Sequence, residues 1–199
     1  MRDKASKLRL TLAGAAALAV VGGAAAADGT TASPDRGDNG SNAVFVTLQG
    51  LNGEEVGRVK LLQKPGEVVV SGTAQGLTPG FHGFHIHAIG LCEAGAPSGP
   101  FTTAGGHYTG GLPNHGDHAG DMPSLLVTKD GHAWASFVTD RFTLDELRDL
   151  DGSAVMVHAG RDNFANIPSR YTSGGVAGPD ATTLATGDAG SRAACGVID

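Results

Sequence analysis

The segment from Phe81 to His87 constrains this chain more than any other stretch, because it places two histidines two residues apart. Side chains of an extended strand alternate between its faces, so residues i and i+2 point the same way. A strand here would hold the imidazoles of His85 and His87 on one side, as half of a site for copper or zinc, which suit neutral imidazole. Alone, such a pair is a weak signal that ordinary surface or core histidines also give.

The other histidines strengthen this interpretation, since nearly all of them lie in glycine-rich loops or at strand ends. Glycine allows the sharp turns that a loop around an ion needs. His132 follows a predicted turn and should be exposed, whereas His82 points away from His85 and should be buried, bonding to backbone groups. The full set is His82, His85, His87, His107, His115, His118, His132 and His158.

Alternating apolar and polar residues predict about eight short strands. Turns at Asn52-Gly53 and Pro65-Gly66 join the first three, and Asp130-Gly131 is a strong hairpin signal between two later ones. The 32 glycines and few aromatic residues also favour strands and loops over a helical bundle. We therefore predict an all-β fold, an eight-stranded antiparallel Greek-key sandwich or flattened barrel. The expected strands are 43–48, 57–63, 67–73, 81–87, 125–129, 132–139, 153–158 and 193–198.

Two long loops interrupt the strand pattern, at residues 88–123 and 159–190. Loops this long inside a compact domain are normally functional or disordered. The first one contains Cys92, three histidines and Asp121, and such clustered ligand-type residues favour function. Residues 142–150 predict a short helical turn, and Trp134, on a predicted strand, is expected to pack in the core.

The first residues have the pattern of an export signal. A basic start precedes an apolar stretch at residues 10–21, and small residues before Asp28 offer a cleavage site. An uncleaved anchor is the alternative, because residues 10–27 are just long enough to span a bilayer, although alanine and glycine make a poor span. The expected organisation is a signal peptide at residues 1–27, a flexible linker at 28–42 and one folded domain at 43–199.

Charge and cysteine content narrow the compartment and the partners. Cleavage would remove four basic groups and one acid, so the formal charge would move from −6 to −9, which disfavours nucleic acid and anionic membranes as partners. The two cysteines, Cys92 and Cys195, predict one disulfide in an exported protein, with two free thiols that bind metal as the alternative. We expect the protein in the periplasm, at the cell envelope or outside the cell, with no membrane attachment after cleavage.

Five blocks in a fixed order resemble the copper-zinc superoxide dismutases, and in particular their bacterial exported branch. The resemblance covers essentially all of residues 43–199. The blocks are GFHIH at 83–87, AGGHY at 104–108, HAGD at 118–121, VMVHAG at 155–160 and TGDAGSRAACGVI at 186–198.

The resemblance implies two metal sites that share one histidine, together with roles for Asp162 and Arg192. Asp162 would join a copper histidine to a zinc histidine through hydrogen bonds. Arg192 would attract and hold superoxide beside the open copper position. The alternative for Arg192 is a surface residue that pairs with Asp188 or with a backbone carbonyl. The implied ligands are His85, His87, His107 and His158 for copper, and His107, His115, His118 and Asp121 for zinc.

The activity that the resemblance implies is the dismutation of superoxide to oxygen and hydrogen peroxide. Copper would alternate between two oxidation states, while zinc, which has no redox chemistry, would serve structure and electrostatics. His107 would be both a bridging ligand and a proton donor, and a homodimer is possible. A non-catalytic copper- and zinc-binding or copper-delivery domain of the same fold is the alternative, but it would not need Arg192. A purely adhesive sandwich would not need the histidines.

The sequence departs from the family pattern in the zinc loop. Only Gly116 and Asp117 separate His115 from His118, whereas the family usually has a longer insertion. If His115 cannot reach the ion, then Asp117 or water could replace it, or zinc could bind weakly or not at all.

Overall fold

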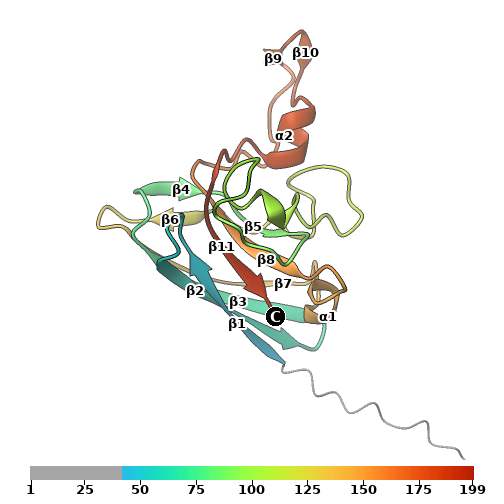
Figure 1. The fold of residues 1–199 in the computed structure, drawn as a ribbon. Helices are drawn as coiled ribbons and strands as arrows, with labels where there is room; N and C mark the ends of the chain where they lie inside the picture. Colours follow the sequence, from blue (N-terminus) through green and yellow to red (C-terminus); the bar gives the residue numbers. More distant parts are fainter. Residues whose placement is uncertain (1–41) are drawn as a thin grey trace, which may run out of the picture. The chain divides into compact units, whose positions relative to one another are not determined.

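The computed structural model describes residues 42–199, which form a nearly closed antiparallel β-barrel (Figure 1). The predicted signal peptide at residues 1–27 and almost all of the predicted linker at 28–42 lie outside the described residues. In the described part of the chain, no helix is long and apolar enough to cross a membrane.

Nine strands form one sheet in the order β4-β6-β7-β3-β2-β1-β11-β8-β5, and the predicted all-β class is confirmed. The predicted turns are present, with φ of 79° at Gly53, 77° at Gly66 and 81° at Gly131. The strands are β1 (Ala43–Gln49), β2 (Glu55–Lys64), β3 (Glu67–Gln75), β4 (Gly80–His82), β5 (Phe84–His87), β6 (Leu125–Val127), β7 (His132–Thr139), β8 (Ser153–His158) and β11 (Arg192–Ile198).

The ninth strand arises because the segment predicted as one strand is divided at Gly83 into β4 and β5. β4 pairs with β6, whereas β5 pairs with β8 at the opposite end of the sheet order. One short segment therefore reaches both ends of the sheet, which nearly closes the barrel. A Cβ added at Gly83 would lie 2.6 Å from Cβ of Ala189, so the close packing at this division requires glycine.

The core follows the alternation of the strands, and β8 is the exception that matters for the site. On β1, the side chains of Val44, Val46 and Leu48 point inward. All residues of β8 are buried, because the barrel interior covers one face and the loop at residues 88–123 covers the other. The predicted disulfide between Cys92 and Cys195 is confirmed and ties this loop to β11.

Trp134 was expected in the core, and this prediction is wrong, since its side chain is 70% exposed. Alternation along β7 turns Ala133 inward and therefore turns Trp134 outward. His132 is exposed, as predicted. His82 is buried, also as predicted, and its two ring nitrogens face the carbonyl oxygens of His158 and Thr78 at 2.6 and 2.7 Å.

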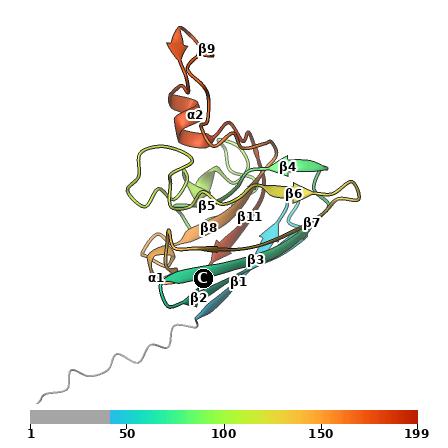
Figure 2. The same ribbon diagram turned by 180° about the vertical axis from the view of Figure 1, so that it is seen from behind.

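The connections between the strands contain more regular structure than the sequence predicted. The helical turn expected within residues 142–150 is confirmed as α1 (Leu144–Leu147). The segment 159–190, expected to be all loop, contains α2 (Ala181–Thr186), which Asp180 caps by accepting a hydrogen bond from the Thr183 amide. It also contains the hairpin of β9 (Thr172–Ser173) and β10 (Val176–Ala177), which projects beyond α2 in Figures 1 and 2. The loop at residues 88–123 contains the 3-10 turn Thr102–Ala104.

Candidate metal centre

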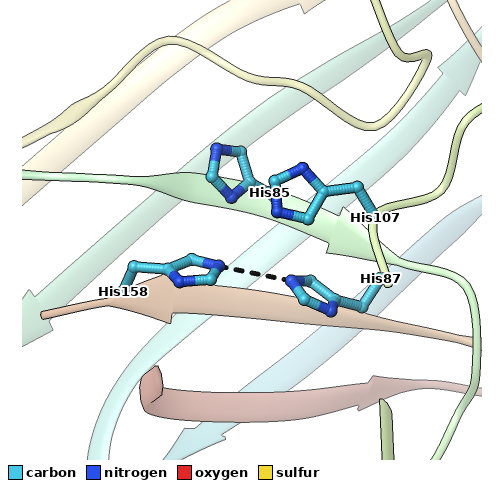
Figure 3. Close-up of side chains that lie close together, drawn as sticks. All are labelled: His85, His87, His107 and His158. Atoms are coloured by element: carbon cyan, nitrogen blue, oxygen red, sulfur yellow. Dashed lines mark hydrogen bonds between the residues drawn. The ribbon is translucent and has the colours of Figure 1, made fainter. Parts of the chain in front are cut away.

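Four histidines from three parts of the chain face one another in the barrel wall (Figure 3). β5 contributes His85 and His87, the end of β8 contributes His158, and the first long loop contributes His107, which forms an isolated bridge with His87. The ring centroid of His107 lies 4.1 Å from that of His85, 4.9 Å from that of His87 and 5.7 Å from that of His158. One ligand atom from each of the four lies within 4.8 Å of the others, and all four side chains are buried.

A second buried cluster lies on the other side of His107. Its Nδ1 is 3.2 Å from Nδ1 of His115 and 3.1 Å from Oδ1 of Asp121. His118 completes this group, with Nδ1 3.5 Å from Oδ2 of Asp121. His115 thus reaches the cluster although the loop is short, and the exposed Asp117 is not needed in its place.

Backbone carbonyls fix which ring nitrogens of the first cluster are free. Nδ1 of His87 faces the Gly105 oxygen at 3.0 Å, and Nδ1 of His158 faces the Gly190 oxygen at 3.0 Å. A carbonyl oxygen only accepts, so these nitrogens carry hydrogen and both Nε2 atoms present lone pairs. The two Nε2 atoms are 3.3 Å apart (Figure 3, dashed line). Facing lone pairs at this distance call for a cation between them.

Asp162 connects the two clusters. Its Oδ2 accepts a hydrogen bond from Nε2 of His85, and its Oδ1 accepts one from Nε2 of His115, each at 2.7 Å. This leaves Nδ1 of His85 free, and both this atom and Nδ1 of His118 are buried without a hydrogen-bond partner. An unsatisfied buried group costs about 1–3 kcal/mol unless a ligand satisfies it, so the donor set fits metal ions.

The glycine that ends α2 packs against this connection. Gly187 has φ 58°, and a Cβ there would lie 2.1 Å from Oδ1 of Asp162 and 2.2 Å from Nε2 of His115. The amide of His115 also donates to the carbonyl of Leu184 at 2.7 Å. The second long loop therefore holds the second cluster through backbone contacts, and no side-chain pattern in the sequence signals this.

Burial and hydrogen bonding set the charges of the two clusters differently. Burial lowers the pKa of His158 to about 3 and holds that of His87 well below its ordinary value, so both rings stay neutral, as metal ligands must be. Burial opposes charge at Asp121 too, but hydrogen bonds from His107 and His115 outweigh it and lower its pKa. For His115, hydrogen bonds to Asp121 and Asp162 outweigh burial and raise the pKa to about 9, so a metal ion there would displace a proton.

An open cavity of about 500 Å³ leads to the first cluster, with Arg192 on its wall. The guanidinium donates to the carbonyl oxygens of Phe101 and Gly105, and the Gly105 oxygen also faces His87. Arg192 is therefore anchored by backbone carbonyls, as one part of the alternative predicted. Asp188 has other partners, since its Oδ2 accepts hydrogen bonds from Asn163 and Thr183.

Comparison with known proteins agrees with this geometry. The family model described as copper/zinc superoxide dismutase matches residues 55–198. The superoxide dismutase [Cu-Zn] of Mycobacterium tuberculosis is 46% identical over 82% of this chain and 73% of its own length, and that of Photobacterium leiognathi is 38% identical over 73% and 80%. The solved Cu/Zn superoxide dismutase from Brucella abortus superposes with a TM-score of 0.60, at 32% identity, over 79% of this chain and 99% of its own.

Proposed function

The chain belongs to the copper/zinc superoxide dismutase family, and we propose a role for each residue of its site. It converts superoxide to oxygen and hydrogen peroxide, with copper and zinc as cofactors. The carrying observation is that His107 lies between two buried donor clusters, the histidines His85, His87 and His158 and the group of His115, His118 and Asp121. The proposed copper ligands are His85, His87, His107 and His158, and the proposed zinc ligands are His107, His115, His118 and Asp121.

His107 has the position of a residue that can both bridge the two clusters and hold a proton on the copper side. When bound, copper supplies the one-electron chemistry, whereas zinc does not change its oxidation state. Nδ1 of His107 faces the zinc group, so Nε2 is the atom available on the copper side, where it can also hold a proton for the product. Asp162 keeps His85 and His115 oriented, and Arg192 binds the anionic substrate at the cavity wall.

Metal analysis tests the shared-site assignment. Protein purified without chelators and loaded with both metals should contain equal amounts of copper and zinc, because each proposed site has four nitrogen or oxygen donors. A large excess of copper would remove the zinc assignment and leave the copper site and the dismutase activity intact. The alternative of a non-catalytic metal-binding domain is not favoured, since it does not account for Arg192 beside an open cavity.

We propose that the protein forms a homodimer through an apolar row on β4, β6 and β7. Phe81 lies opposite Leu126, and the pairing of Val127 with Ala133 sets Leu126 beside Trp134. Phe81, Leu126 and Trp134 are 50%, 49% and 70% exposed. Contiguous exposed aromatic and apolar side chains of this kind are typical of protein interfaces, and a two-fold axis would pack the row against itself.

Sedimentation velocity tests this interface. Trp134→Glu should sediment as a monomer at concentrations where the unchanged protein is a dimer, because it would bury charge in the apolar contact. Phe45→Glu is the matched control, since Phe45 is 74% exposed on β1, outside the row, and should leave the dimer intact. A monomeric unchanged protein, or a dimeric Trp134→Glu variant, would contradict the proposal.

We propose that the protein is exported to the periplasm, the cell envelope or the medium. The basic and apolar start of the chain supports this, and so does the disulfide, which is typical of oxidising compartments. Mass spectrometry of protein recovered outside the cytoplasm should find a chain that begins at Asp28, and cytoplasmic protein with an intact N-terminus would contradict export.

A further inference from the structure

Arg141 follows β7 in the connection to α1, and its guanidinium lies against the loop that carries the proposed zinc ligands. Nη2 donates to the carbonyl oxygen of Asp117 at 2.9 Å and to that of Gly116 at 3.3 Å. Nη1 approaches the carbonyl oxygens of Gly116 at 3.4 Å and of Asp121 at 3.5 Å. Three carbonyl groups of one short loop thus converge on a single exposed side chain.

The loop needs such an anchor because it supplies three ligands without any helix or strand of its own. On its inner side, the amides of Gly116 and His118 donate to Oδ2 of Asp121 at 2.7 and 3.1 Å. Two N–H groups of the loop thus donate to Asp121, and the carbonyl oxygens of the loop accept hydrogen bonds from Arg141. The backbone around His118 is therefore fixed from both sides.

The loop also packs closely against Phe164. Gly116 packs so closely on Phe164 that an added Cβ would lie 2.6 Å from the Phe164 carbonyl oxygen. The Phe164 ring is stacked with that of His115, with centroids 6.2 Å apart. Arg141 and Phe164 line the same cavity of about 490 Å³, together with Gly116 and Asp121 of the loop. Phe164 and the guanidinium of Arg141 therefore both contact the loop at Gly116.

By its charge alone, Arg141 would weaken zinc binding, because a guanidinium near a zinc site repels the ion. Its exposure screens this repulsion, but the sign remains unfavourable to zinc. Arginine offers five donors in a rigid planar fork, which lysine does not. A geometric role and an electrostatic role therefore predict opposite changes in zinc affinity when Arg141 is removed.

We propose that Arg141 is a positioning residue for the zinc site, which holds the carbonyls of Gly116, Asp117 and Asp121 so that His118 and Asp121 meet His107 and His115. The inference rests on the zinc assignment proposed above. It also accounts for how a loop with only two residues between His115 and His118 can present a complete ligand set.

The test measures zinc affinity rather than activity. The full protein, unchanged or with Arg141→Ala or Arg141→Lys, is titrated with zinc in competition with a coloured chelator, and Co²⁺ replaces zinc for absorption spectra. Partners that orient ligands typically contribute 10–100-fold in metal affinity, so Arg141→Ala should weaken zinc binding by about 10-fold or more and reduce the tetrahedral Co²⁺ bands. Arg141→Lys should lie between the two. Arg58→Ala, which removes an exposed arginine that pairs with Glu55, is the matched control and should change neither readout.

Each other outcome has a defined meaning. Tighter zinc binding by Arg141→Ala would overturn the inference, because the electrostatic effect would then dominate, and unchanged binding would overturn it because no positioning effect would be left. Equal losses of copper and zinc affinity with a lower melting temperature would overturn it too, since they indicate a general role in folding. If the unchanged protein bound no zinc, the zinc assignment itself would be wrong. If the unchanged protein and Arg141→Ala bound zinc equally well, only the role of Arg141 would be wrong.

Discussion

Replacing His158 with alanine is expected to abolish dismutase activity while leaving the barrel folded. The change removes one of the two Nε2 atoms that face each other at 3.3 Å, and with it a proposed copper ligand. Loss of a residue that only orients a ligand costs about 10–100-fold, so loss of the ligand itself should cost more than about 100-fold in activity and copper affinity. Superoxide-dependent dye reduction with copper-loaded protein, together with copper analysis, measures both effects.

The fold should survive this change because the contact between His158 and His82 uses the backbone carbonyl, which alanine retains. His132→Ala is the matched control, since it removes an exposed histidine from β7 and should keep full activity. Zinc content should also be retained in His158→Ala, because the zinc group lies beyond His107. Equal activity in the copper-loaded unchanged protein and the His158→Ala variant would defeat the copper assignment.

The strands and the order of the ligand blocks could be predicted from the sequence because both leave local patterns. Alternation predicts β1, β2 and β3 and their turns, and the i, i+2 spacing predicts that His85 and His87 share a face. The division of one strand at Gly83 was not predicted, although the apolar positions change phase there, from Phe81 to Phe84 and Ile86. It is set by close packing on Ala189 and by pairing with two different strands.

The errors at Trp134 and α2 have separate causes. Trp134 was assigned by residue type, although the alternation of β7 was already sufficient to turn it outward. α2 consists of alanine, threonine and one leucine, and threonine is a weak helix former, so its local signal was low. Its caps, Asp180 and Gly187, are residue types that are equally common in loops, so they do not by themselves indicate a helix.

The contacts that orient the metal ligands are the least visible part of the sequence. Gly105 and Gly190 act through carbonyl oxygens, which every residue has, so their identity carries no information about this role. Arg141 is distant in sequence from the loop that it contacts, and an isolated arginine is usually a surface residue. Such contacts follow from how the chain folds back on itself and need coordinates to be seen.

Arg192→Ala is expected to reduce kcat/KM about 10-fold or more, since charge at the mouth of a cleft raises the association rate of a small ion by about 10–1000-fold. Arg192 is a cation beside the copper cluster in an open cavity, and the chain as a whole is negatively charged. Without the guanidinium, superoxide would meet a net repulsive field. Pulse radiolysis, which generates superoxide directly, measures the rate.

Ionic strength distinguishes attraction by Arg192 from a structural role. Salt screens the attraction, so the rate of the unchanged protein should fall as salt is added, and that of Arg192→Ala should fall less steeply or rise. Arg192→Lys keeps the charge but loses the forked contact with the Phe101 and Gly105 carbonyls, so it should retain the salt dependence with only part of the rate. Copper content must stay equal in all three proteins, and Arg58→Ala serves as the control for removing a distant charge. If Arg192→Ala showed the same salt dependence as the unchanged protein, Arg192 would act by holding the first long loop in place rather than by attracting the substrate.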